Sequence, residues 1–420
     1  MMRQEPNLPN MKTRTWGILV LLLSLPALVY AGDKNKYLTW DDWFSSLPSS
    51  DRRASWDDDI FWSCCDDFND DSFTFKYNRV DGIFFGVKKL REVHRRRGAM
   101  QIYGGAGVGL KSGQFQYHAV VERSFFPIGG QFAIGGEFYD ATYSEDGWVI
   151  PTWENTLGAI LIREDFLDYY RREGAGGYIS QHFTRKAKLK IGYLEEKHRM
   201  LENQTNWSLF GGSKKFRINP AIDELTLKGL YGKFQIDTRG SRSYSRQGWL
   251  LAMSGEYFTD NFEGDTNFER YILELRRYQP ISRGENLNFR LRVGETVGIV
   301  PVQKHFDLGG ISTLRAFKYK EFTGDRMILA NLEYQIDWDR LDWALDLPIV
   351  NELNLILFAD AGLAWFKAEK DFDELASRDF HSDIGIAFAT SNGSFRLNIA
   401  KRTDRSKDAV RVTFRISRPF

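Results

Sequence analysis

The sequence has 420 residues, and 57 Lys and Arg against 56 Asp and Glu give a formal charge of +1, which offers no support for a nucleic-acid-binding protein. Its mean hydropathy of −0.42 excludes a bundle of membrane helices, because each such helix needs about 20 consecutive apolar residues. Aromatic residues make up 15% of the chain and Gly contributes 37 residues, a combination that favours β structure and excludes a disordered chain.

The first predicted element is an export signal at residues 1–31. Lys12 and Arg14 precede a short apolar run, 16–31, that ends in a small residue. This order of a basic region, an apolar region and a small residue at the cleavage point is typical of a secretory signal peptide. A single membrane anchor is the alternative, but the run is short for a spanning helix and Pro26 interrupts it.

Residues 32–71 form a short acidic segment with several Trp, which we expect in the periplasm. Its aspartates imitate the start of a calcium loop near residue 67, but the turn glycine and the bidentate glutamate of such a loop are missing. The two cysteines, Cys64 and Cys65, are adjacent, so they provide neither a disulfide framework nor a zinc knuckle. We therefore predict no metal and no cofactor, and interpret the segment as solvated.

From residue 72 onward, apolar and polar residues alternate along the chain. Near the C-terminus, for example, Val412 and Phe414 point one way while Arg411, Thr413 and Arg415 point the other. One face is nearly all apolar, and the other holds charges that a dry core would not accept unpaired. Repeated segments of about ten such residues are the signature of a transmembrane β-barrel, whereas strands of a soluble sandwich are shorter. We therefore predict an all-β, closed antiparallel transmembrane β-barrel over residues 72–420.

Sixteen strands are expected in this barrel. Fifteen can be drawn directly: 79–90, 99–110, 114–124, 131–140, 176–183, 187–196, 224–236, 248–257, 268–279, 286–297, 326–338, 353–365, 383–389, 394–401 and 409–420. Because single-chain bacterial barrels have even strand numbers, one strand is missing from this set. Residues 72–78 are the preferred choice, and 156–163 are the rival.

The lengths of the connections predict the orientation in the membrane. If the C-terminus lies in the periplasm, the long connections 141–175, 197–223, 298–325 and 366–382 all fall on the outer side, where barrels carry their long loops. The segment 153–172 mixes strand and helix signals, so it is either part of a folded outer loop or an insertion into the lumen. We expect the protein in the bacterial outer membrane, surrounded by lipid and lipopolysaccharide.

Two motifs in the last third of the chain resemble those of the BamA/TamA family, also called the bacterial surface antigen family. Residues 306–310 (FDLGG) with 314–317 (LRAF) resemble its sixth-extracellular-loop motif, although Ala316 stands where the family usually has Gly. Residues 358–362 (FADAG) resemble its Phe-x-Asp-x-Gly strand motif, and 77–82 resemble the segment that leads into the barrel in some members. The resemblance implies a barrel whose long outer loop folds inward.

The resemblance also implies site residues. Asp360 lies on the polar face of its strand, and Arg315 of an inward-folded loop could offer it a bidentate fork. The implied loop–lumen lock consists of Arg315, Phe317, Phe358, Asp360, Gly362, Gly309 and Gly310, and the implied C-terminal insertion signal consists of Phe414, Ile416 and Phe420. If the loop needs a positive φ at Ala316, that residue is strained. Pinning a plug is the favoured role of the lock, ahead of a direct part in transport.

Family members that insert or secrete proteins usually carry polypeptide-transport-associated domains before the barrel. Only the 41 residues 32–72 separate the predicted signal from the barrel, so we expect a short form without such a domain. Capture of a client by strand addition to that domain could then not operate within this chain, which weakens the inference that it inserts other barrels.

Three functions are considered for this sequence. The first is assistance in assembly or translocation of a protein or lipid client at a weakly paired seam between the first and last strands, with the barrel-assembly machinery as partner for the protein's own insertion. The second is a passive pore lined by Arg290, Arg292, Arg396, Arg411 and Arg415. The third is an outer-membrane phospholipase, but His381 and Ser382 are neighbours on a strand and point to opposite faces, so we predict no catalytic residues and no enzyme.

Overall fold

The computed structural model describes residues 73–89, 91, 100–125, 131–184, 186–239, 246–337, 353–390, 395–404 and 410–416. All of them belong to one compact unit, Ser50–Phe420. The predicted signal peptide, the acidic segment with Cys64 and Cys65, and Phe420 lie outside the described residues.

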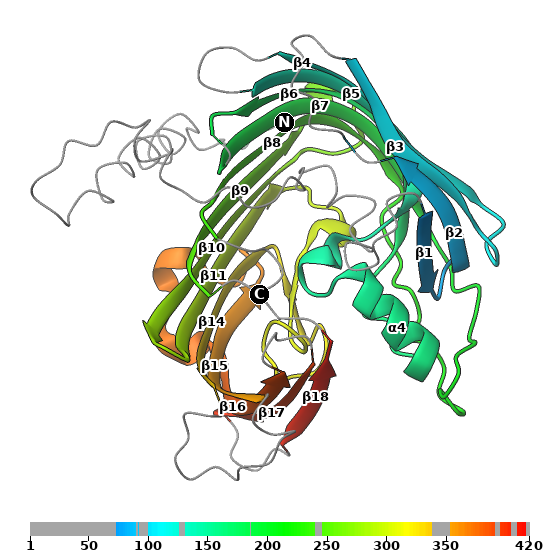
Figure 1. Cartoon of the computed structure of the whole chain (residues 1–420). Coiled ribbons are helices and arrows are strands. Elements are labelled where there is room, and N and C mark those ends of the chain that lie inside the picture. The colour runs from blue at the N-terminus through cyan, green and yellow to red at the C-terminus, as the bar shows by residue number, and fades with distance from the viewer. Residues whose placement is uncertain are drawn as a thin grey trace, which may run out of the picture. The chain divides into compact units, whose positions relative to one another are not determined.

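One antiparallel sheet of sixteen strands dominates the structure, and each strand pairs with its neighbours in this order along the chain (Figure 1). The strands are β1 (Phe73–Asn78), β2 (Gly82–Lys89), β3 (Met100–Gly109), β4 (Phe115–Phe125), β5 (Gln131–Tyr143), β6 (Tyr170–His182), β7 (Ala187–Met200), β8 (Leu225–Asp237), β9 (Gly248–Phe258), β10 (Phe268–Ser282), β11 (Glu285–Gly298), β14 (Arg326–Asp337), β15 (Leu353–Trp365), β16 (His381–Thr390), β17 (Arg396–Arg402) and β18 (Arg411–Arg415). The predicted strand number is therefore confirmed. β1 and β18 form the two edges, and within the described residues no ladder joins them.

The preferred sixteenth strand, 72–78, is confirmed as β1, and the rival, 156–163, is wrong because it lies mostly within helix α4 (Thr152–Ile162). Pro151 precedes this helix in extended conformation, and the run that follows lacks the period of two that a half-buried strand requires. The predicted strand 79–90 begins three residues early, because the Asn78 side chain accepts hydrogen bonds from the N–H groups of Val80 and Asp81 and closes a turn there.

The predicted strand 176–183, in contrast, begins too late, because β6 begins at Tyr170. Its ladder extends to the pair Tyr143 and Tyr170, so β5 and β6 are both longer than the alternation suggested. Shorter elements lie in the connections: η1 (Glu145–Trp148), η2 (Asp260–Phe262), η3 (Val302–Lys304), β12 (Phe306–Leu308), β13 (Phe322–Gly324), η5 (Phe372–Glu374) and η6 (Ser377–Asp379).

The two faces of the sheet have opposite polarity and unusual exposure. Arg290 and Glu333 are 0% and 1% exposed, whereas Phe115 and Phe414 on the other face are 57% and 58% exposed. A sheet folded for water would hide the phenylalanines and expose the charges. This arrangement is the one expected when lipid covers the apolar face and protein fills the space on the polar face. None of the helices in the described ranges is long and apolar enough to cross a bilayer.

Because neighbouring strands are antiparallel, successive connections alternate between the two ends of the sheet. Four long connections share one end: 144–169, called the helix loop because it contains α4; 201–224; 299–325, called the lock loop; and 366–380. In the lock loop, β12 and β13 pair as a small sheet of their own. These loops bring their side chains to the polar face and to the strand edges.

Candidate functional site

The centre of the lock loop is fixed to the polar face of the sheet by Arg315. Its Nε and Nη2 each donate to a carboxylate oxygen of Asp360 in β15, both at 2.7 Å, and Nη1 donates to Glu333 Oε1 in β14 at 2.7 Å. The guanidinium also lies 3.6 Å from the centre of the Phe358 ring. The structure thus brings together the pair implied by the motifs, and it adds Glu333, which the sequence did not single out.

The residues around Arg315 complete this lock. The N–H of Ala316 donates to Asp383 Oδ2 at 3.1 Å, and Phe317, which is fully buried, packs under the guanidinium of Arg402. Ala316 is not strained, because the non-glycine residues of the lock loop with positive φ are Ser312 (φ 62°) and Lys320 (φ 51°). Gly309 has φ 122°, and a Cβ there would lie 2.3 Å from the carbonyl oxygen of Lys318, so a glycine is required.

Gly362 provides a second close approach between the lock loop and the sheet. A Cβ at this position of β15 would lie 3.2 Å from Leu308 Cδ1 in β12, which is tight for two carbon atoms. Gly310 (φ 84°) begins the tip that carries Arg315. All seven residues of the implied lock therefore lie in or against the lock loop.

The five arginines predicted to line the lumen are engaged in contacts within the protein. Arg290 and Arg292 both pair with Glu274, and Arg396 donates to both carboxylate oxygens of Glu333. Arg411 donates to the carbonyl oxygen of Phe317 in the lock loop. The fifth, Arg415, donates to Ser312 and Glu154. Four of the five are less than 10% exposed, namely Arg290, Arg292, Arg396 and Arg415.

Helix α4 lies between the two edge strands (Figure 1). On one side, Glu154 accepts hydrogen bonds from Arg415 Nε and Nη2 of β18, at 2.8 and 2.9 Å, and from the N–H of Ile416 at 2.7 Å. On the other side, Thr156 Oγ1 accepts from the N–H of Tyr77 in β1 at 3.3 Å. Two side chains of one helix thus occupy backbone donors on both edges of the sheet.

An apolar contact supports the β1 side of this bridge. Tyr77, Ala159 of α4 and Phe216 form a buried cluster, and the Tyr77 hydroxyl donates to the carbonyl oxygen of Trp207 at 2.6 Å. No pattern in the sequence indicated this arrangement, because the residues come from three distant segments. The mixed signals in 153–172 left strand and helix both open, and nothing local located the segment at the seam.

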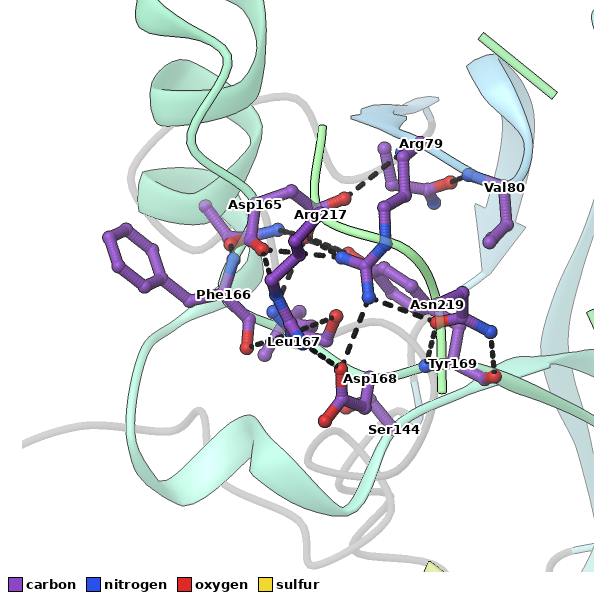
Figure 2. Close-up of polar contacts among 12 residues, drawn as sticks. Arg79, Val80, Ser144, Asp165, Phe166, Leu167, Asp168, Tyr169, Arg217 and Asn219 are labelled. Carbon is purple, nitrogen blue, oxygen red and sulfur yellow. Dashed lines mark hydrogen bonds and ion pairs between the residues drawn. The ribbon is translucent and has the colours of Figure 1, made fainter. Parts of the chain in front are cut away.

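Arg79, in the turn between β1 and β2, anchors the helix loop (Figure 2). The side chain is fully buried, and it donates to the carbonyl oxygen of Asp165 at 3.2 Å, to Asp168 Oδ1 at 3.1 Å and to Asn219 Oδ1 at 3.0 Å. The N–H of Arg79 also donates to Asp165 Oδ2. Arg217 reinforces the same chain segment by donating to three successive carbonyl groups, those of residues 165–167.

Lys320 connects the lock loop to the helix loop. Its ammonium lies 2.7 Å from Asp168, 2.8 Å from Asp146 and 3.1 Å from Asp307. Burial alone would lower the pKa of Lys320, but these carboxylates raise it well above its usual value, so the ammonium stays charged. Burial raises the pKa of Asp146, and the neighbouring charge of Asp168 adds to that effect although Lys320 opposes it.

The histidine and serine considered for catalysis do not form a nucleophile–base pair. The His381 ring stacks on Phe322, with ring centres 3.8 Å apart, while Ser382 Oγ is hydrogen-bonded to Thr403 Oγ1. Among the insertion-signal residues, Phe414 is exposed on the apolar face and Ile416 contacts Glu154 through its N–H.

Comparisons with known proteins agree with this architecture. Residues 162–420 match the Omp85 superfamily domain, and residues 66–229 match the C-terminal domain of a family of unknown function (DUF5686). The chain is 27% identical over 117 residues to the outer membrane protein assembly factor BamA of Nitratidesulfovibrio vulgaris, a match that covers 24% of this chain and 15% of that protein.

Two solved structures are also similar. BamA from Haemophilus ducreyi lacking POTRA domains 1–3 aligns with a TM-score of 0.50 at 14% identity, over 82% of this chain and 69% of that one. CdiB from Acinetobacter baumannii aligns with a TM-score of 0.40 at 11% identity, over 82% of this chain and 58% of that one. At these identities the BamA structure supports the fold.

Proposed function

Because the chain belongs to the Omp85 superfamily of outer-membrane β-barrel proteins, we propose that it assists the assembly or translocation of other outer-membrane components at the seam between β1 and β18. The client is a protein segment able to pair as a β-strand. The long connections face the cell exterior in this proposal, and outer-membrane lipid and lipopolysaccharide surround the apolar face. The barrel-assembly machinery is the partner for the protein's own insertion.

The observation that carries this proposal is the occupation of both sheet edges by a helix. An edge strand presents a row of backbone donors and acceptors that can template an added strand. α4 has its own backbone hydrogen bonds within the helix, so it meets the edges through side chains, at Glu154 and Thr156. Displacement of α4 would free two short edges for an incoming strand.

The lock loop supports the last strand of this seam. Arg415 of β18 donates both to Ser312 of the lock loop and to Glu154 of α4. The lock loop is itself fixed to β14 and β15 through Arg315. We therefore assign the lock a pinning role, in which it holds β18 and α4 in register while the seam is at rest.

The pairing of the five predicted lumen arginines does not favour the alternative, a passive pore. Arg290 is fully buried against Glu274, and Arg396 is bound by Glu333, so neither offers a solvated charge to a passing solute. The proposed function requires no cofactor and no catalytic residue.

Crosslinking α4 to β1 tests the proposal. Lys76 and Leu157 are each one position away from the hydrogen-bonded pair Tyr77 and Thr156, and cysteines at these two positions are joined by a flexible, reducible thiol crosslinker. Cys64 and Cys65 are first replaced by Ser. The protein is reconstituted in liposomes, and the folding of a urea-denatured eight-stranded outer-membrane barrel is followed by protease protection.

The proposal predicts that the crosslink abolishes the acceleration of folding and that reduction restores it. The matched control is a crosslink between Leu230→Cys and Tyr257→Cys, an exposed register pair of β8 and β9, which leaves the seam free. An unchanged folding rate with α4 tethered to β1 would contradict the proposal. Stable single-channel conductance without any effect on folding would favour the passive pore.

A further inference from the structure

A group of exposed apolar side chains lies at the C-terminal end of α4 and in residues 207–210, outside the strands of the sheet. We call it the apolar foot; its members are Leu161 (36% exposed), Ile162 (53%), Trp207 (53%), Leu209 (54%) and Phe210 (76%). An exposed apolar patch on a folded protein usually marks a surface that binds something. Neither the lock nor the bridge across the seam uses these side chains.

Backbone hydrogen bonds hold the two parts of the foot together. The N–H of Leu209 donates to the carbonyl oxygen of Ile160 at 2.7 Å, and that of Phe210 donates to the carbonyl oxygen of Leu161 at 2.8 Å. Arg163, which ends the helix with φ 60°, donates to Ser208 Oγ at 3.1 Å and to the carbonyl oxygen of Gly212 at 3.2 Å. The foot is therefore a built surface, in which the end of α4 and residues 207–212 are fixed to each other.

The foot continues the surface that faces lipid. Trp207 contacts the ring of Tyr77 in β1 edge-on, with ring centres 5.9 Å apart. Two residues before Tyr77, the exposed ring of Phe75 belongs to the apolar face of β1 and packs against Phe85 of β2 at 5.3 Å. The apolar face of the hairpin β1–β2 and the apolar foot are therefore neighbours, and Tyr77 of β1 contacts the foot through Trp207.

The charges around the foot fit an anionic lipid surface. Arg163, Lys214 and Lys215 lie within or next to its two segments, and the ammonium of Lys214 pairs with Glu164 at the exposed surface. Trp, Phe and Leu beside Lys and Arg are the composition of protein segments that rest in the headgroup region of a bilayer. Basic residues at such a surface are attracted to anionic headgroups.

We propose that the apolar foot is a membrane-docking surface: the end of α4 and residues 207–210 rest in the lipid headgroup region beside the edge of β1, on the side that carries the long connections. The helix loop then touches lipid at the seam rather than standing in water. This inference depends on the lipid-facing surface of β1, and it holds whether or not the seam accepts client strands.

Site-specific fluorescence tests the proposal. Phe210→Cys, in a chain that carries Cys64→Ser and Cys65→Ser, is labelled with a polarity-sensitive fluorophore and reconstituted at low protein density into vesicles of phosphatidylethanolamine and phosphatidylglycerol. Because Phe210 is mostly exposed, the substitution should not disturb folding. Spin-labelled lipid, with the quencher near the headgroup, then reports whether the label lies in the bilayer.

Two matched positions give the limits of the signal. Phe115→Cys on the apolar face of β4 is the lipid-facing reference, and Asn261→Cys in the exposed η2 turn at the same end of the sheet is the aqueous reference. The proposal predicts that the label at 210 emits at short wavelength and is quenched by lipid as strongly as the label at 115. A label at 210 that behaves like the one at 261 would overturn it. Short-wavelength emission without quenching by lipid would also overturn it, because protein, such as a second copy of this chain, would then cover the foot.

Discussion

The middle of the sheet and its two edges are stabilised in different ways. Within the residues that the structure describes, β10 and β11 pair along fourteen positions of a nearly continuous ladder, whereas β17 and β18 pair at five and β1 and β2 at six. At the edges, side chains from the loops replace missing ladder partners: Glu154 contacts β18 and Thr156 contacts β1. Backbone ladders form and break cooperatively, but a few side-chain contacts can be exchanged one by one. On the proposed function, the edges are therefore the part of this sheet that opens.

Among the substitutions that test the support of the edge strands, removal of the guanidinium of Arg315 should lower stability the most. Arg315→Ala leaves the buried carboxylate of Asp360 without its cation and leaves Glu333 with Arg396 alone, and a broken buried pair typically costs about 3–5 kcal/mol. We expect a lower urea midpoint for unfolding in detergent and rapid proteolysis within the lock loop. A loss below about 1 kcal/mol would show that the lock does not hold the loop.

Arg79→Ala should release the helix loop with a loss of about 3 kcal/mol, because it removes a buried cation that joins Asp165, Asp168 and Asn219. Limited proteolysis should then cut within residues 163–168 while the fragments of β6 to β11 stay intact. If cleavage appeared first in the middle strands, Arg79 would stabilise the whole sheet and not the helix loop in particular.

Glu154→Gln should loosen both edges while sparing the middle. The amide keeps the size of the side chain but loses the charge that binds Arg415, for an expected loss of about 1–3 kcal/mol. Hydrogen exchange measured by mass spectrometry should speed up in peptides from β18 and β1, with peptides from β8 unchanged. Equal acceleration in all three would mean that the edges and the middle open as one unit.

Acid should weaken the contact between the helix loop and the lock loop. Burial would raise the pKa of Asp168, but Lys320, Arg217 and Arg79 outweigh it, and the pKa of Asp168 is lowered. Its stabilising contribution is therefore complete above the unfolded value of about 3.9 and is lost as the pH falls below that value. Proteolysis of the helix loop should therefore increase as the pH falls below about 3.9. In Asp168→Asn the rate of this proteolysis should depend less on pH.

The smallest effect is expected from an exposed ion pair in the middle of the sheet. The side chains of Arg199 and Glu173 are 45% and 47% exposed, so Arg199→Ala should change stability by no more than about 0.5 kcal/mol. The substitution is also the control for Arg315→Ala, since both remove one arginine, from an exposed ion pair here and from two buried ion pairs at Arg315. A comparable loss of unfolding free energy in Arg199→Ala and Arg315→Ala would contradict the claim that the buried ion pairs stabilise the protein more than the exposed one.

The alternation of apolar and polar residues predicted fifteen of the sixteen strands. The even strand number of single-chain barrels required one more, and the preferred segment 72–78 is confirmed as β1. The motifs around Arg315 and Asp360 correctly pointed to two segments that meet. The bridge at the seam was not predictable, because Glu154 and Arg415 are 261 residues apart and no local pattern records their contact. For the same reason the contacts of Glu333 and of Arg79, which lies in the motif 77–82, were found only in the structure.

Disulfide formation across the seam tests most directly whether α4, rather than a ladder, joins β1 to β18. Cysteines are placed in pairs on exposed positions of the two edges, Phe73 or Phe75 with Val410, Val412 or Phe414, in the chain that lacks Cys64 and Cys65. A disulfide requires Cα atoms roughly 4.4–6.8 Å apart, so paired neighbouring strands allow it and a helix between them prevents it. The control pair, Leu230→Cys with Tyr257→Cys, sets the oxidising conditions in liposomes, because it must form a disulfide under them. Under these conditions we predict no disulfide for any seam pair. Efficient disulfide formation at a seam pair would contradict the account.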